Sequence, residues 1–234
     1  MKTSFPDLVV DLIDFFLPVQ CAACENSLVY GEEVICLSCL INLPLTGFER
    51  QTGNPVEKQF WGKVPVAEAM ALLHFTKGEK VQRILHKLKY GGRPEIGIKM
   101  GRWCAGRIKS ITTYATADVI IPVPLHKKKE RLRGFNQSAM FALGLSEGMG
   151  ICCLPDGLIR LKNTGTQTRK SRFDRSGNVS DVFVPGPDYD LHGKSVILVD
   201  DVITTGSTLT ASALALLSAG AAKVSVAAIA YAAA

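Results

Sequence analysis

The sequence contains no apolar run long enough to cross a membrane. A membrane-spanning helix needs about 18 or more consecutive apolar residues, and no stretch of the 234 residues reaches that length. The N-terminus also lacks the unbroken apolar core and basic front of a secretory signal, because Asp7, Asp11 and Asp14 interrupt it. These acids recur at helical spacing, so we expect an amphipathic helix over residues 1–17 in a cytoplasmic protein without membrane insertion.

Internal repeats and low-complexity segments are also absent. Hydrophobic residues make up 47% of the chain, which is enough to bury a core and excludes a largely disordered protein. The length allows one α/β domain with a small appendage, or two small domains. The formal net charge of +6 favours anionic partners such as phosphates or nucleic acid, but it is too small to decide alone.

Cysteine is scarce outside one cluster. Four of the seven cysteines form two Cys-x-x-Cys pairs, Cys21 with Cys24 and Cys36 with Cys39, separated by eleven residues. Disulfides are not expected in a cytoplasmic chain, whereas two such pairs complete a tetrahedral four-sulfur site that suits Zn²⁺. A closed shell leaves no open position, so the metal is expected to be structural and to stabilise a small module over residues 18–46. Unligated thiols, a redox pair and an iron site are the alternatives.

Apolar runs alternate with helical patterns over residues 47–234. This alternation predicts an α/β domain with a mostly parallel sheet and helices on both of its faces. Residues 47–65 are expected to form an irregular linker, and residues 163–178 a long polar loop. The expected strands are 67–75, 117–123, 158–162, 194–199 and 223–231, and the expected helices are 79–90, 95–111, 136–147 and 208–218.

The most informative segment follows the apolar run Ser195–Val199. Asp200 and Asp201 come first, and then Thr204–Thr208 lead into a helix rich in Ala and Leu. Backbone N–H groups and hydroxyls at a helix N-terminus form an anion site, while two acids suit ribose hydroxyls or a hydrated Mg²⁺. A solvated turn with capping residues is the alternative. The segment is not a P-loop, because the Gly-Lys-Ser/Thr ending is absent.

Three basic stretches accompany this segment: Lys89–Arg93, His126–Gln137 and Asn163–Arg175. Each fits pyrophosphate oxygens, a nucleic-acid backbone or a solvated charged surface. Together with the anion loop they favour anion binding. A pyrophosphate group that leaves during a transfer reaction carries negative charge, which basic side chains can neutralise. The candidates for this role are Lys89, Arg131, Arg133 and Arg169.

The ordered set of motifs resembles the ComF family, which includes ComFC-like and GntX-like proteins. The motifs are the two cysteine pairs, Leu88–Gly91, Val123–His126, Arg133–Gln137, Thr164–Asn178 and Val196–Thr208. The resemblance spans about residues 12–231. One departure is Arg169, which stands where the family usually has Leu, so the role of that stretch is open.

The resemblance implies a type I phosphoribosyltransferase fold with an N-terminal zinc-ribbon-like module and phosphoribosyl pyrophosphate (PRPP) as ligand, with Mg²⁺. It places Asp200 and Asp201 on the ribose hydroxyls. It also implies a cytoplasmic role in DNA uptake during natural transformation, near single-stranded DNA and competence-machinery proteins. The other residues expected to bind PRPP are Val202 and, around the 5′-phosphate, Thr204, Thr205, Gly206, Ser207 and Thr208.

Three functions remain open from the sequence. The chain fits a phosphoribosyltransferase with an unidentified acceptor. It also fits a PRPP-sensing or single-stranded DNA-handling protein without turnover, and a nucleobase-salvage phosphoribosyltransferase that carries zinc. The fold alone cannot choose among them, because one fold supports many activities.

Overall fold

The computed structural model describes residues 19–161 and 182–233. The helix expected over residues 1–17 and the whole loop expected over residues 163–178, with Arg169 in it, lie outside these ranges. Across the described ranges, no helix is long and apolar enough to cross a membrane.

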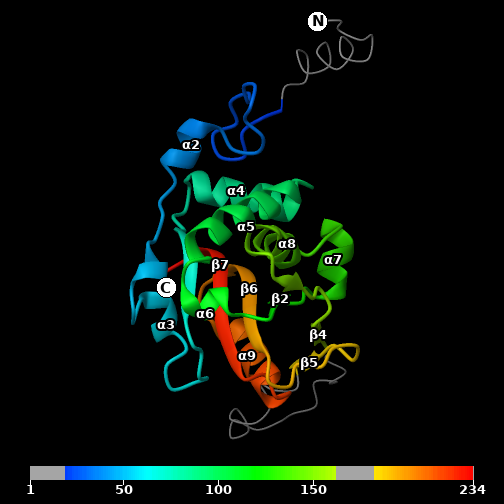
Figure 1. Ribbon diagram of the computed structural model, residues 1–234. Helices are drawn as coiled ribbons and strands as arrows, with labels where there is room; N and C mark the ends of the chain where they lie inside the picture. The colour runs from blue at the N-terminus through cyan, green and yellow to red at the C-terminus, as the bar shows by residue number, and fades with distance from the viewer. Residues whose placement is uncertain (1–18, 162–181, 234) are drawn as a thin grey trace, which may run out of the picture.

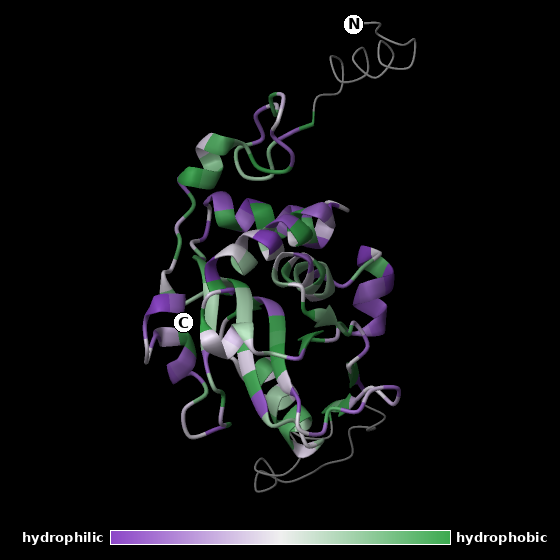
Figure 2. Cartoon of the chain, viewed as in Figure 1, coloured by the Kyte–Doolittle hydropathy of each residue, from purple (hydrophilic) through white to green (hydrophobic). Residues whose placement is uncertain are grey.

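A five-stranded parallel sheet forms the centre of the structure, in the order β1-β7-β6-β2-β3 (Figure 1). Its two longest strands, β6 and β7, are mostly buried and apolar, as expected of parallel strands covered on both faces (Figure 2). The mostly parallel sheet predicted from the sequence is confirmed. The strand bounds are β1 Ala69–His74, β2 Val119–Pro122, β3 Cys152–Cys153, β6 Ser195–Ile203 and β7 Lys223–Tyr231.

Helices α5 (Glu95–Ile108) and α8 (Gln137–Met149) pack together at unusually short range. Gly101 and Gly144 make this possible, because a Cβ at Gly144 would overlap the carbonyl oxygen of Ile98, and one at Gly101 that of Phe141. Helix α4 (Lys80–Tyr90) lies beyond them, and α9 (Ser207–Ser218) lies across the sheet from α8. The helix expected over residues 95–111 ends at Ile108, and α6 (Thr112–Ala115) follows it.

The connections of β2 and β6 run in opposite directions along the sheet. Strand β2 leads through α8 to β3 on one side, while β6 leads through α9 to β7 on the other. Their carboxyl ends are neighbours, and the Val123 N–H donates to the Val199 carbonyl at 2.8 Å. In open α/β sheets, ligands bind in the crevice at such a reversal of strand order. This topology therefore locates the candidate site.

Residues 47–65, expected to be an irregular linker, are more ordered than predicted. They contain the short helices η1 (Phe48–Arg50) and α3 (Pro55–Lys58). The Asn54 side chain caps α3 by accepting from the Val56 and Glu57 N–H groups, and its amide donates to the Ala69 carbonyl on β1 at 2.9 Å. A buried Asn that satisfies several backbone groups fixes the approach to the sheet. The module before it contains α2 (Leu37–Ile41).

Two further expectations need correction. The basic stretch after β2 was not among the expected helices, but it forms α7 (Lys127–Arg133), which His126 caps and Gly134 ends with a φ of 82°. Strand β6 was expected to end at Val199, but it continues to Ile203 because β7 pairs with it through Tyr231. Strands β4 (Leu158–Arg160) and β5 (Phe183–Pro185) form a separate antiparallel pair, and β3 and β5 were not predicted.

Substituting Gly144 with Ala is expected to lower the free energy of unfolding by about 1–3 kcal/mol or more, because α5 and α8 must move apart. The matched control is Gly106→Ala on α5, where a Cβ meets no atom within 4 Å. That control should stabilise the helix by about 0.5–1 kcal/mol. Urea unfolding of both variants measures the contrast, and equal stabilities would contradict this account of the packing.

Candidate functional site at the carboxyl ends of β2 and β6

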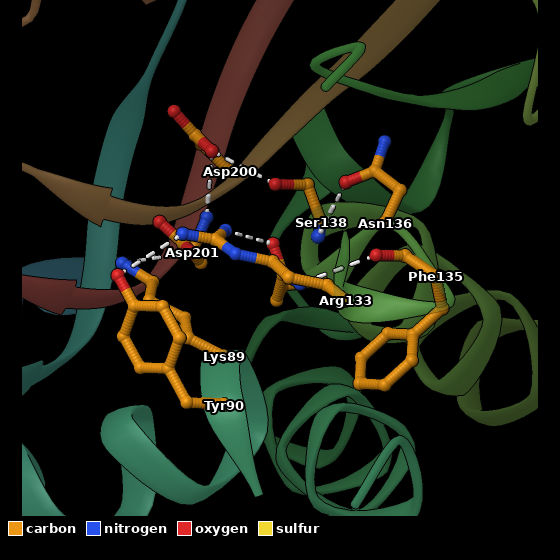
Figure 3. Close-up of polar contacts among 9 residues, drawn as sticks. Lys89, Tyr90, Arg133, Phe135, Asn136, Ser138, Asp200 and Asp201 are labelled. Carbon is orange, nitrogen blue, oxygen red and sulfur yellow. Dashed lines mark hydrogen bonds and ion pairs between the residues drawn. The ribbon is translucent and has the colours of Figure 1, made fainter. Parts of the chain in front are cut away.

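Asp200 and Asp201 lie near the carboxyl end of β6 (Figure 3). One carboxylate oxygen of Asp200 accepts two hydrogen bonds at 2.8 Å, from the Ser138 hydroxyl and from the Asp201 N–H. Ser138 belongs to the first turn of α8, whose N-cap is Asn136. The Asn136 amide also donates to the Val123 carbonyl at 3.0 Å. The β2-to-α8 connection therefore orients the first acid of β6.

The electrostatic environment opposes two full negative charges here. Burial, followed by the charge of Asp201, raises the pKa of Asp200 to about 7, although Ser138, the Asp201 N–H and Lys89 act in the opposite direction. Two adjacent acids of this kind titrate as a coupled pair. Near neutral pH, a cation or a set of hydrogen-bond donors next to the two carboxylates therefore stabilises the pair.

Lys89 supplies one such cation. Its ammonium lies 2.9 Å from the Asp201 carboxylate, and the two side chains are 23% and 14% exposed. Lys89 comes from the last turn of α4. The sequence suggested Lys89 as a partner for a leaving pyrophosphate, whereas the structure brings it to the two acids.

Arg133, another candidate, lies next to this pair (Figure 3). Its guanidinium stacks on the Tyr90 ring, 5.0 Å from the centroid, and donates to Tyr90 Oη at 3.3 Å and to Gln137 Oε1 at 2.6 Å. Stacking and bidentate donation are what a planar guanidinium does well. These contacts hold the end of α7 against the end of α4, beside the acids.

The Thr204–Thr208 loop follows β6 and starts α9, as predicted. Gly206 is the N-cap, with a φ of 71° that favours glycine. The hydroxyls of Thr205 and Ser207 are 2.9 Å apart. Together with Asp200 and Val202, the loop lines a small hollow of about 40 Å³. The first N–H groups of the helix are directed here, which favours an anion.

Gln59 was not predicted to belong to the site. Its amide donates to the Thr204 carbonyl at 2.7 Å, and a Cβ at Gly206 would lie 2.9 Å from its side-chain oxygen. It comes from the segment expected to be a linker, and no local pattern marks it. Ser138 and Tyr90 were also missed, since their roles depend on contacts between elements far apart in sequence.

Arg131 lies away from the acids. It lines a separate cavity of about 470 Å³ between α7 and the β4–β5 pair. Arg169 lies outside the described residues. Among the described residues of its lining, all the ionisable side chains are basic, and together they form what we call the basic cavity: His126, Lys127, Lys128, Arg131 and Arg160.

The four clustered cysteines have the geometry of a metal site. Their sulfur atoms all lie within 4.8 Å of one another, and the Sγ atoms of Cys24 and Cys36 are 3.8 Å apart. Tetrahedral bonding to Zn²⁺ at its usual Zn–S length gives sulfur separations of about 3.8 Å. The Ala23 and Cys36 N–H groups donate to Cys21 Sγ at 3.4 and 3.3 Å. The donor set therefore fits a metal such as zinc.

The thiol pKa values show why the cluster favours a cation. Burial raises the pKa of Cys21, but N–H groups of Cys24, Cys36 and Ala23 outweigh it and bring the value to about 6. Burial, followed by the neighbouring thiols, raises the pKa of Cys39 to about 12. Four thiolates so close together are stable only with a positive ion among them.

The cysteine module is docked on α4. The Arg83 guanidinium donates to the Ala23 carbonyl at 2.7 Å, and the Lys87 ammonium lies 3.1 Å from the Glu25 carboxylate. Arg93, which follows α4, donates to the Gln20 carbonyl at 2.8 Å. The helix that carries Lys89 and Tyr90 at one end therefore supports the module along its length.

Comparison with known proteins supports a phosphoribosyltransferase domain in this chain. Residues 150–234 match the family model described as phosphoribosyl transferase domain. The chain is 32% identical over 146 residues to DNA utilization protein YhgH of Salmonella typhi, covering 61% of this chain and only 63% of that protein. It is 27% identical over 210 residues to competence protein F of Haemophilus influenzae, covering 83% and 89% of the two chains. Competence protein ComFC of Bacillus subtilis is 37% identical over 102 residues, covering 44% and 39%.

Replacing Cys24 with Ser is expected to abolish metal binding and to lower the melting temperature, because three thiolates no longer close the shell. Cys152→Ser, at an exposed cysteine outside the cluster, is the matched control. Elemental analysis of purified protein should find one metal ion per chain in the native protein and in the control. A native protein without zinc or iron would rule out the site.

Replacing Asp200 with Asn should change how stability depends on pH. Because the folded-state pKa of about 7 exceeds the ordinary Asp value, the folded chain loses stability as pH rises from about 4 through 7. Asn is uncharged and avoids this loss. Between pH 5 and pH 8, the free energy of unfolding of the variant should therefore rise by on the order of 2 kcal/mol relative to that of the native protein. Urea unfolding at both pH values measures it. If the variant and the native protein differed in stability by the same amount at both pH values, the raised pKa assigned to Asp200 would be wrong.

Proposed function

The chain belongs to the ComF family and carries a phosphoribosyltransferase domain, and from this premise we propose that it binds PRPP at the carboxyl end of β6. One observation carries the proposal. The two adjacent acids of β6 and the N-terminus of α9, which is rich in Thr and Ser, lie together in the crevice where the strand order reverses. That crevice is where open α/β sheets bind ligands.

Each part of PRPP has a matching group. Thr204–Thr208 bind the 5′-phosphate with hydroxyls and with the N–H groups that begin α9. Asp200 and Asp201 accept hydrogen bonds from the ribose hydroxyls. If Mg²⁺ came with the pyrophosphate, Asp200 and Asp201 would hold it, and its charge would neutralise the pyrophosphate and the two carboxylates.

In phosphoribosyl transfer the bond from C1 to pyrophosphate breaks and a bond to an acceptor forms, through an oxocarbenium-like state. Positioning and charge neutralisation then supply most of the catalysis. We assign Lys89 and Arg133 to the leaving pyrophosphate, since both lie beside the acids. We assign to Arg131 and Arg169 the role of attracting the anion as it approaches the site.

Handling of single-stranded DNA without turnover is the second candidate. The basic cavity favours it, because a lining of five basic side chains attracts a phosphodiester backbone. Such a protein would act in the cytoplasm with the competence machinery during DNA uptake, using PRPP as a signal. No observation favours the third possibility, a nucleobase-salvage enzyme.

We assign Zn²⁺ to Cys21, Cys24, Cys36 and Cys39, in preference to iron. The closed shell of four thiolates leaves no site for substrate, so the metal is structural. The proposed organisation is an N-terminal helix over residues 1–17, a zinc module over residues 18–46 and the phosphoribosyltransferase domain over residues 47–234.

PRPP binding can be measured by isothermal titration with Mg²⁺ present. We expect saturable binding by the native chain and at least a hundredfold weaker binding by the double variant Asp200→Asn, Asp201→Asn, because two charge-assisted hydrogen bonds are lost. The matched control is Asp188→Asn, Asp190→Asn, two acids on the loop before β6. Undiminished binding by the first variant would disprove the assignment. Pyrophosphate release with a panel of nucleobases then separates transfer from binding alone.

A further inference from the structure

Gln59 supports the bend between β6 and α9 from outside the small hollow. Its Nε2 donates to the Thr204 carbonyl at 2.7 Å. A Cβ at Gly206 would lie 2.9 Å from Gln59 Oε1 and 3.7 Å from a ring carbon of Phe60. Gln59 and Phe60 therefore fill the space beside the bend. Neither residue belongs to the lining of the hollow, which the bend itself forms with the end of β6.

The backbone around Gln59 is anchored to the central sheet. Gln59 ends α3, and its N–H donates to the Val56 carbonyl at 3.2 Å. Val56 and Phe60, on either side of it in the chain, are buried in the core. Asn54, which caps the start of α3, donates to the Ala69 carbonyl on β1 at 2.9 Å. The Gln59 side chain therefore extends from a fixed position, and its hydrogen bond holds the bend relative to the sheet.

The hydrogen bond to Thr204 determines the direction of the next peptide group. The described residues contain no cis peptide bond, and in a trans peptide the C=O and the following N–H point in opposite directions. Because the Thr204 carbonyl points to Gln59, the Thr205 N–H points away from Gln59. This direction suits an anion held in the hollow, next to the first N–H groups of α9.

The stability of the fold does not account for a glutamine at this position. Gln59 Oε1 is buried and receives no hydrogen bond from any residue that the structure describes, and such an acceptor destabilises the folded state. Turning the amide over would place Oε1 against the Thr204 carbonyl, where two acceptors would meet. Thr204 is exposed, so water can satisfy its carbonyl without Gln59. A polar group that costs stability beside a candidate site is typical of functional positions.

We propose that Gln59 is a positioning residue of the PRPP site. It fixes the Thr204–Thr205 peptide so that the Thr205 N–H donates to the 5′-phosphate. The inference rests on the proposed function, because it requires that the hollow binds this phosphate. Gln59 contacts the bend at Thr204 and Gly206, so its effect falls on the phosphate end of the ligand. Ribose 5-phosphate, which carries that end without pyrophosphate, is therefore as sensitive to Gln59 as PRPP.

The test compares Gln59→Met with Gln51→Met, the same change at an exposed residue of the same segment. Isothermal titration with PRPP and Mg²⁺, and separately with ribose 5-phosphate, measures binding. We expect Gln59→Met and Gln59→Ala to bind both ligands at least tenfold more weakly, because one N–H donor to the phosphate loses its direction. Gln59→Met should melt at or above the native temperature, because the buried acceptor is removed. Gln51→Met should match the native protein in affinity and melting temperature.

Native affinity of Gln59→Met for ribose 5-phosphate would overturn the proposal, and so would an equal loss in Gln51→Met. A lower melting temperature of Gln59→Met together with weaker binding would assign Gln59 a purely structural role and overturn it too. If the native chain bound neither ligand, the proposed function would fail, and amide NMR of the ligand-free protein would decide on Gln59. The Thr205 amide resonance should be single and sharp in the native protein and broadened or doubled in Gln59→Met. Identical resonances would overturn the positioning role.

Discussion

The pairing of β6 between β2 and β7 is the constraint on which the candidate site depends. It keeps Asp200 and Asp201 inside a strand, where the backbone fixes their directions. It also places the start of α8 close enough for Ser138 to donate to Asp200. A strand that ended at Val199 would leave both acids on a turn, free to face solvent and relieve their repulsion. The raised pKa of Asp200 is the electrostatic consequence of holding them in place.

Helix α4 connects the two functional parts of the chain. Arg83 in the first turn and Lys87 in the last turn bind the cysteine module, and Lys89 and Tyr90 at the end of the helix meet Asp201 and Arg133. A rigid helix transmits a shift at one end to the other, so loss of the module would disturb the position of Lys89. This arrangement would give a metal in the cysteine cluster a reason to accompany a phosphoribosyltransferase domain, although the cluster lies far from the acids in sequence.

The sequence predicted those features that short patterns encode. Apolar runs identified the parallel strands, paired cysteines identified the four-sulfur cluster, and the order of acids, threonines and glycine identified the turn from β6 into α9. It failed where tertiary contacts decide. Strand β6 continues past Val199 because β7 pairs with it, and Gln59 reaches Thr204 across 145 residues of chain. The ordered stretch around Asn54 depends on the hydrogen bond from the Asn54 side chain to β1, which local sequence propensity cannot predict.

The two acids alone do not describe the charge of the site, because a cation lies beside them. With Lys89 against Asp201, the unliganded site is already partly neutralised. In the proposed complex, a magnesium ion carried by pyrophosphate would compete with this ammonium for Asp201, and it would bring two charges where the ammonium brings one. The ion pair would therefore set a threshold that a ligand without a cation does not overcome, so the proposed preference for PRPP would begin with electrostatics before any base is recognised.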